Sequence, residues 1–183
     1  MTTTFRQGTA QGLFHDLVCD AERHAHIELP HAVEGYLVLT LLRHLNMRTA
    51  RTLYQTLAPR LAAIVDPRVR ASTGTLRDTG DACLMLAGLF PEQAHRRHVN
   101  VGYFVDIGQI AYAKLADTDS GGSLFTELRA WFPGLIDVLQ TIRSRERTLD
   151  AMTAYETWQA TGSRQAGKQL PGMPIRADQE QLI

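Results

Sequence analysis

The sequence predicts an all-α fold: a single-domain helical bundle of about seven or eight helices, followed by a flexible C-terminal tail. Apolar residues recur every three or four positions along most of the chain, as on one face of a helix. No stretch alternates polar and apolar residues for long enough to predict a strand. The length of 183 residues fits one domain. We expect a helical domain over 1–162 and, because glycine and proline become frequent, a tail over 163–183.

Two helices are predicted at the N-terminal end. An apolar stripe that includes Leu13 and Ala21 predicts a helix over 9–27. Residues 31–45 are apolar around most of the helix circumference, which is typical of a central, buried helix. Pro30 marks the boundary between the two.

Prolines divide the next part of the chain. A helix over 49–58 is expected to bend or break before Pro59, because proline lacks the amide donor and disfavours helical geometry at the preceding residue. The helical pattern resumes through Ile64. Asp66 and Pro67 then fit the N-cap and the first position of a further helix.

The remaining helices are predicted from apolar periodicity and from their polar or proline boundaries. Pro91 follows the first of them, and the polar run 117–122 closes the second. Ser123 is the predicted N-cap of the third, which Pro133 separates from the fourth. The predicted ranges are 76–90, 101–115, 124–131, 135–145 and 148–158.

Charge, hydropathy and cysteine content limit the classes of partner and the cellular location that we expect. Nineteen Lys and Arg balance nineteen Asp and Glu, which excludes the basic footprint of a generic nucleic-acid or anionic-membrane binder. We find no secretory h-region and no apolar run long enough for a bilayer. Cys19 and Cys83 lie in apolar helical patterns and are predicted to be small buried residues. We therefore expect a cytoplasmic protein without nucleic-acid or membrane partners.

A central block carries a family resemblance. A Gly-Asp pair at residues 80–81 opens an apolar helix that ends at a Phe-Pro corner, and a Tyr-rich helix with a small-residue core follows. Through Leu76–Glu92 and Val99–Leu115 the chain resembles a family of uncharacterised bacterial all-helical proteins. The resemblance implies a helix–corner–helix unit and brings no activity with it.

Small residues are aligned along both helices of this unit. Gly80, Cys83 and Ala87 form one seam, and Gly108 and Ala111 lie on another. Each helical glycine costs about 0.5 to 1 kcal/mol relative to alanine, so several of them indicate that close contact matters. The contact is either tight packing within the chain or a pocket or self-association surface.

Three carboxylates of the unit are candidates for chemistry. Asp78 and Asp81 share one helix, and Asp106 lies on the next. Together they could hold a divalent cation or act as acid and base. The alternative is structural: Asp78 is an exposed first-turn residue, and Asp81 accepts a hydrogen bond from Tyr103 or Tyr112.

Histidine and glutamate cluster near the N-terminus. Glu22 and His26 are four residues apart, and Glu28 and His31 have the Glu-x-x-His spacing of di-iron bundles. An iron site or a haem ligand is one hypothesis for this cluster. The other is surface polar contacts, because Pro30 interrupts the motif between Glu28 and His31.

Two basic clusters lie at predicted helix ends. Arg96 and Arg97 follow the Pro91 corner, and Arg143, Arg145 and Arg147 close a later helix. Either cluster could bind phosphate or an acidic partner surface. Solvated cations that complement the helix C-terminal dipole are the alternative.

The chain contains none of the common nucleophile, phosphate-loop or dinucleotide motifs. We therefore expect a non-enzymatic adaptor or regulator that binds another protein, with self-association into a homo-oligomer expected as well and no cofactor. One alternative is a metal- or haem-dependent helical enzyme that uses the N-terminal His/Glu cluster, and another is a small-molecule sensor with a pocket between the Leu37 and Tyr103 helices. The expected binding surface comprises Asp78, Asp81, Arg96, Arg97, Tyr103, Asp106 and Tyr112.

Overall fold

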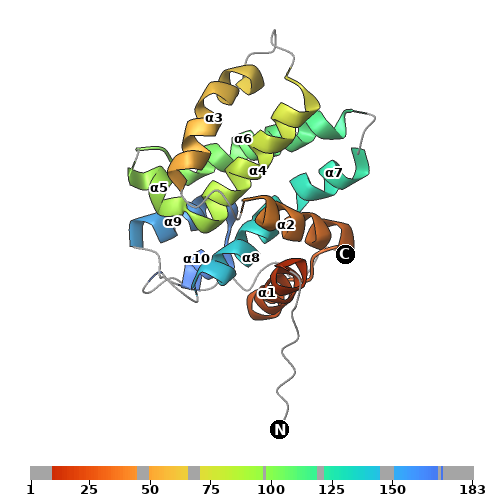
Figure 1. The fold of residues 1–183 in the computed structure, drawn as a ribbon. Helices are drawn as coiled ribbons and strands as arrows, with labels where there is room; N and C mark the ends of the chain where they lie inside the picture. Colours follow the sequence, from red (N-terminus) through yellow and green to blue (C-terminus); the bar gives the residue numbers. More distant parts are fainter. Residues whose placement is uncertain are drawn as a thin grey trace.

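The protein is described by a computed structural model that covers residues 10–44, 50–65, 71–96, 98–118, 122–144, 151–168 and 170. Within these ranges every regular element is a helix, so the predicted all-α class is confirmed (Figure 1). None of the helices in the described ranges has the length and apolar character needed to cross a membrane. In chain order the helices are α1 (Ala10–Ala25), α2 (His31–His44), α3 (Ala50–Val65), α4 (Thr73–Leu89), α5 (Pro91–Arg96), α6 (Val101–Ala116), α7 (Gly122–Ala130), α8 (Phe132–Ser144), α9 (Ala151–Thr161) and α10 (Arg164–Lys168).

Helix α4 is the centre of the core. Every residue from Thr79 to Gly88 is buried, and α4 packs against α3, α6 and α8. In Figure 1, α3 runs beside α4, whereas α1 lies at one end of the molecule and α2 lies next to it. The prediction that 31–45 forms the central helix is therefore wrong. Leu39 on α2 is 50% exposed, so α2 is not buried around its whole circumference, although Tyr36 and Arg43 of α2 also bond to Asp81 of α4.

Glycines of α4 and α6 let neighbouring helices approach closely. A Cβ atom on Gly80 would overlap the ring of Tyr112, and one on Gly108 would overlap the ring of Phe132. Gly88 faces Leu139 of α8 in the same way. The small-residue seam thus serves packing within the chain, which is the first of the two roles predicted for it.

Helix α3 continues through Pro59, so the break that was one of the two predicted outcomes does not occur. Leu53, Leu57 and Ile64, which flank the proline on both sides, are each at most 2% exposed. These residues lie on one face, and α3 packs against α4. Burial of one continuous apolar face offsets the hydrogen bond that Pro59 removes. Asp66 and Pro67 lie outside the described residues.

Other helix boundaries differ from the predictions by a few residues. Helix α4 begins earlier than expected because the Ser72 hydroxyl accepts a hydrogen bond from the Thr75 amide at 3.1 Å and so caps the helix. Pro91 begins α5, where its missing amide costs no hydrogen bond. Ser123 is not an N-cap, since α7 already begins at Gly122.

Part of the predicted tail belongs to the folded body. Ser163 is 1% exposed and Ala166 is fully buried, and α10 packs against α8 and α9. The Ser163 hydroxyl donates to the buried carboxylate of Asp137 and accepts from the Ala166 amide at 3.1 Å. The boundary expected at 163 is thus placed too early. Residues 171–183 lie outside the described part of the chain.

The close approach of α6 to its neighbours can be tested with one substitution. Gly108→Ala is expected to lower the free energy of unfolding by about 1–3 kcal/mol, because the new methyl group meets the Phe132 ring and the Cys83 Cβ. Gly35→Ala on α2 is the matched control, since no atom lies within 4 Å of its new Cβ. The control is expected to raise stability by about 0.5–1 kcal/mol. Urea denaturation followed by circular dichroism measures both, and equal effects would contradict the proposed packing.

Candidate functional site

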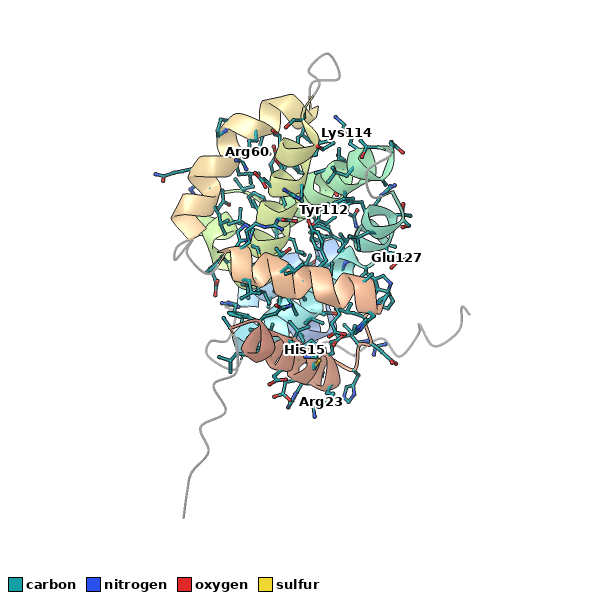
Figure 2. The ribbon with its side chains drawn as sticks, turned by 45° about the vertical axis from the view of Figure 1, so that its right-hand side comes forward. His15, Arg23, Arg60, Tyr112, Lys114 and Glu127 are labelled. Atoms are coloured by element: carbon teal, nitrogen blue, oxygen red, sulfur yellow. The ribbon has the colours of Figure 1, made fainter. Side chains whose placement is uncertain are left out.

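A buried polar cluster lies where α2, α4 and α6 meet. The Asp81 side chain is fully buried, and its Oδ1 accepts hydrogen bonds from the hydroxyls of Tyr36, at 2.7 Å, and Tyr112, at 2.9 Å. Its Oδ2 forms an ion pair with Arg43 Nη1 at 2.6 Å. Figure 2 labels Tyr112 near the middle of the molecule. The predicted bond from Tyr112 to Asp81 is confirmed, and the bond from Tyr36 was not foreseen.

The charges and hydrogen bonds around Asp81 indicate a structural role for this Asp81 cluster, in which the carboxylate links α2, α4 and α6. Burial raises the pKa of Asp81, and the hydrogen bonds from Tyr36 and Tyr112 and the charge of Arg43 oppose that rise. Burial and the nearby carboxylate raise the pKa of both tyrosine hydroxyls, which therefore remain hydrogen-bond donors. The side chain of Arg43 is 41% exposed, so one side of the cluster reaches the surface.

The three carboxylates of the predicted cation or acid–base site do not come together. Asp78 points to α3, where its Oδ2 lies 3.3 Å from Arg60 Nη1 in a half-exposed ion pair. Asp106 is exposed on α6. Asp78 and Asp81 are only three residues apart, yet Asp78 pairs with a residue of α3 and Asp81 bonds to residues of α2 and α6.

The outward side of α6 carries two of the residues predicted for a binding surface. Tyr103 is 41% exposed and Asp106 is exposed, and Ile110, one turn beyond Asp106, is 43% exposed. We call these three residues the α6 face. Tyr112 and Asp81 are fully buried and do not contribute to a surface.

The basic clusters are only partly described. Arg143 is buried and pairs with Glu92, so this member of its cluster joins α8 to α5 and is not a solvated cation. Arg145, Arg147 and Arg97 lie outside the described residues, and nothing is described of the Arg96 side chain.

The predicted His/Glu ligands line a cavity of about 990 Å³ at the turn from α1 to α2. Glu22 Oε1 accepts a hydrogen bond from the Leu29 amide at 2.8 Å. His26 has a φ of 56°, in the left-handed region, which ends α1. Glu28 precedes α2, so Glu28 and His31 are not one turn apart on a helix as the di-iron motif requires. An iron or haem cofactor stays an alternative hypothesis to the prediction of no cofactor.

Another group of metal-ligand side chains lies beside the same cavity. His15 and Cys19 of α1 and Glu34 of α2 place one ligand atom each within 4.8 Å of the others. Cys19 is only half-buried, so the prediction of a small buried residue is wrong for Cys19 and correct for Cys83. The four-residue spacing of His15 and Cys19 could have indicated that these two side chains lie on the same face of a helix. No pattern in the sequence pairs them with Glu34.

The chain matches no protein-family model, and no curated protein or solved structure is significantly similar to it. The resemblance to a family of bacterial helical proteins therefore stays a prediction.

Removing the Asp81 carboxylate is expected to destabilise the protein strongly. Asp81→Ala leaves the Tyr36 and Tyr112 hydroxyls without their acceptor and opens a cavity, at a cost of about 3 kcal/mol in the free energy of unfolding. The matched control is Asp78→Ala, which removes only a half-exposed ion pair on the same helix and costs about 1 kcal/mol or less. Both values follow from urea denaturation. If the two variants lose the same stability, the assigned role of Asp81 is incorrect.

Proposed function

We propose that the protein is a non-enzymatic adaptor or regulator that binds another protein through the α6 face. The observation that carries the proposal is the exposure of two large apolar side chains, Tyr103 and Ile110, on a helix whose opposite side is in the core. They are seven residues apart and flank Asp106, so the three side chains lie on one helix face.

The α6 face is held rigidly. Phe104, Ile107 and Ala111, on the inner side of α6, are each at most 4% exposed, and the helix packs against α4, α7 and α9. The amide of Gly102 donates to the Asn100 side chain at 2.7 Å, which caps the first turn beside Tyr103. A preorganised surface loses little entropy on binding. Tyrosine is enriched among the residues that dominate interface energies.

Charge indicates the chemistry of the partner. Asp106 lies midway between the two apolar side chains, so a complementary surface carries an apolar patch beside a lysine or arginine. Antiparallel pairing of two α6 faces would bring Asp106 close to its own copy, and like charges in that position are unfavourable. The α6 face therefore favours a different protein over a second copy of this chain.

We assign this function to the cytoplasm as part of the same proposal. The two cysteines, Cys19 and Cys83, are free thiols, as is usual in a reducing compartment. The net charge of the chain is zero, so long-range electrostatic attraction would contribute little to binding. A partner would instead be recognised through local groups of charged and apolar side chains.

The double variant Tyr103→Ala/Ile110→Ala tests the α6 face. Tagged protein is purified from the native cells, and co-purifying proteins are quantified by mass spectrometry. We expect recovery of the specific partner to fall about tenfold or more, because each truncated anchor costs more than 1 kcal/mol.

The control is Leu39→Ala, which removes a somewhat more exposed apolar side chain from α2 and should leave recovery unchanged. Thermal melts verify that both variants are folded. Full recovery of the partner with the double variant would reject the α6 face as the binding surface.

A further inference from the structure

Two metal-ligand side chains lie on the same face of α1. His15 and Cys19 are four residues apart, and the Cys19 Sγ lies 3.8 Å from the His15 Nε2. Figure 2 labels His15 on the side of α1 that faces α2, and Arg23 on the opposite side of the helix. The two residues thus present an imidazole and a thiol toward α2.

A carboxylate from α2 meets both of them. Glu34 Oε1 lies 2.9 Å from the His15 Nε2 and accepts a hydrogen bond from the Cys19 thiol at 3.6 Å. The Glu34 side chain is 13% exposed, so it is largely withdrawn from water. The imidazole nitrogen and the thiol sulfur thus approach the same carboxylate oxygen, and the three ligand atoms are close enough together to share one cation.

The spacing of these atoms fits a tetrahedral metal ion. Zinc bonds of about 2.0–2.1 Å to nitrogen and oxygen and about 2.3 Å to sulfur separate neighbouring ligand atoms by about 3.3–3.6 Å. The two distances from the Cys19 Sγ, 3.8 and 3.6 Å, are close to these values. The distance between His15 and Glu34 has to increase by about 0.4 Å, which the half-exposed imidazole allows by rotating.

We propose that His15, Cys19 and Glu34 bind one zinc ion, with the fourth coordination position open to the cavity at the turn from α1 to α2. An imidazole, a thiolate and a carboxylate form a borderline-soft ligand set that suits zinc. Three protein ligands and one open position are the arrangement of zinc sites that exchange a water or a small ligand. Binding replaces the thiol proton of Cys19 with the metal ion, and the proton passes to solvent.

The surrounding charges support a divalent cation at this position. Burial raises the pKa of the Cys19 thiol, and the negative charges of Glu34, Glu22 and Asp16 raise it further. The same carboxylates create a negative potential that attracts zinc. Asp16 also lies 3.9 Å from the His15 Nδ1, the ring nitrogen that would remain free to interact with an outer carboxylate.

Isothermal titration of the full-length, chelator-treated protein with zinc chloride tests the proposal. We expect one equivalent to bind. His15→Ala, Cys19→Ser and Glu34→Gln should each weaken binding by about tenfold or more, because each removes a direct ligand.

The matched control is His24→Ala, which removes another exposed histidine of α1 whose ring nitrogen contacts only the Asp20 carbonyl in the described structure. Its zinc affinity should equal that of the wild type. The proposal is overturned if the wild-type protein binds no zinc, or if Cys19→Ser and Glu34→Gln bind it as tightly as the wild type.

A spectroscopic measurement on the wild-type protein does not depend on the folding of any variant. Cobalt substituted for zinc should give a thiolate-to-cobalt charge-transfer band in the near ultraviolet together with intense visible bands typical of tetrahedral geometry. A cobalt complex without the thiolate band would refute the assignment of Cys19.

His31→Ala tests the open position. His31 is almost fully exposed, with its Nδ1 3.6 Å from Glu34 Oε2, and is the nearest further histidine on α2. Zinc affinity is expected to stay within about twofold of the wild type, since no direct ligand is lost. A loss as large as that of His15→Ala would show that His31 fills the fourth position and would overturn the open site.

Discussion

The contact between Gly80 and the Tyr112 ring is the constraint on which the arrangement of the helices depends. Because Gly80 has no side chain, the ring lies directly against α4 and its hydroxyl reaches Asp81. The same carboxylate binds Tyr36 and Arg43, so α2 is fixed relative to both α4 and α6. A buried, ionisable carboxylate is costly in an apolar core, and these three donors offset that cost.

The two proposed binding features follow from this arrangement. Packing of the inner side of α6 on the core leaves Tyr103, Asp106 and Ile110 on the surface in a fixed geometry. Packing of α2 on α1 brings Glu34 to His15 and Cys19. The α6 face and the His15–Cys19–Glu34 group thus belong to different parts of the molecule and can be tested separately.

The sequence predicted the elements that depend on local patterns better than those that depend on neighbours. The ranges of α2 and α6 were predicted almost to the residue, since apolar periodicity, Pro30 and the polar run after α6 define them. A break at Pro59, one of the two predicted outcomes, does not occur because burial of α3 against α4 outweighs the local effect of a proline. The early tail boundary was wrong because a single buried serine, Ser163, anchors α10 to Asp137.

The sequence by itself determined the all-α class, most helix positions, the close contact at the small-residue seam and a bond from a tyrosine of α6 to Asp81, with Tyr103 and Tyr112 as the two candidates. All of these follow from residue types and spacings within one or two helices. Only the tertiary structure decided which helix is central, that Asp78, Asp81 and Asp106 are apart, and that Glu34 joins His15 and Cys19. Such pairings depend on how helices pack side by side, and no spacing along a single helix encodes which neighbour a given face will meet.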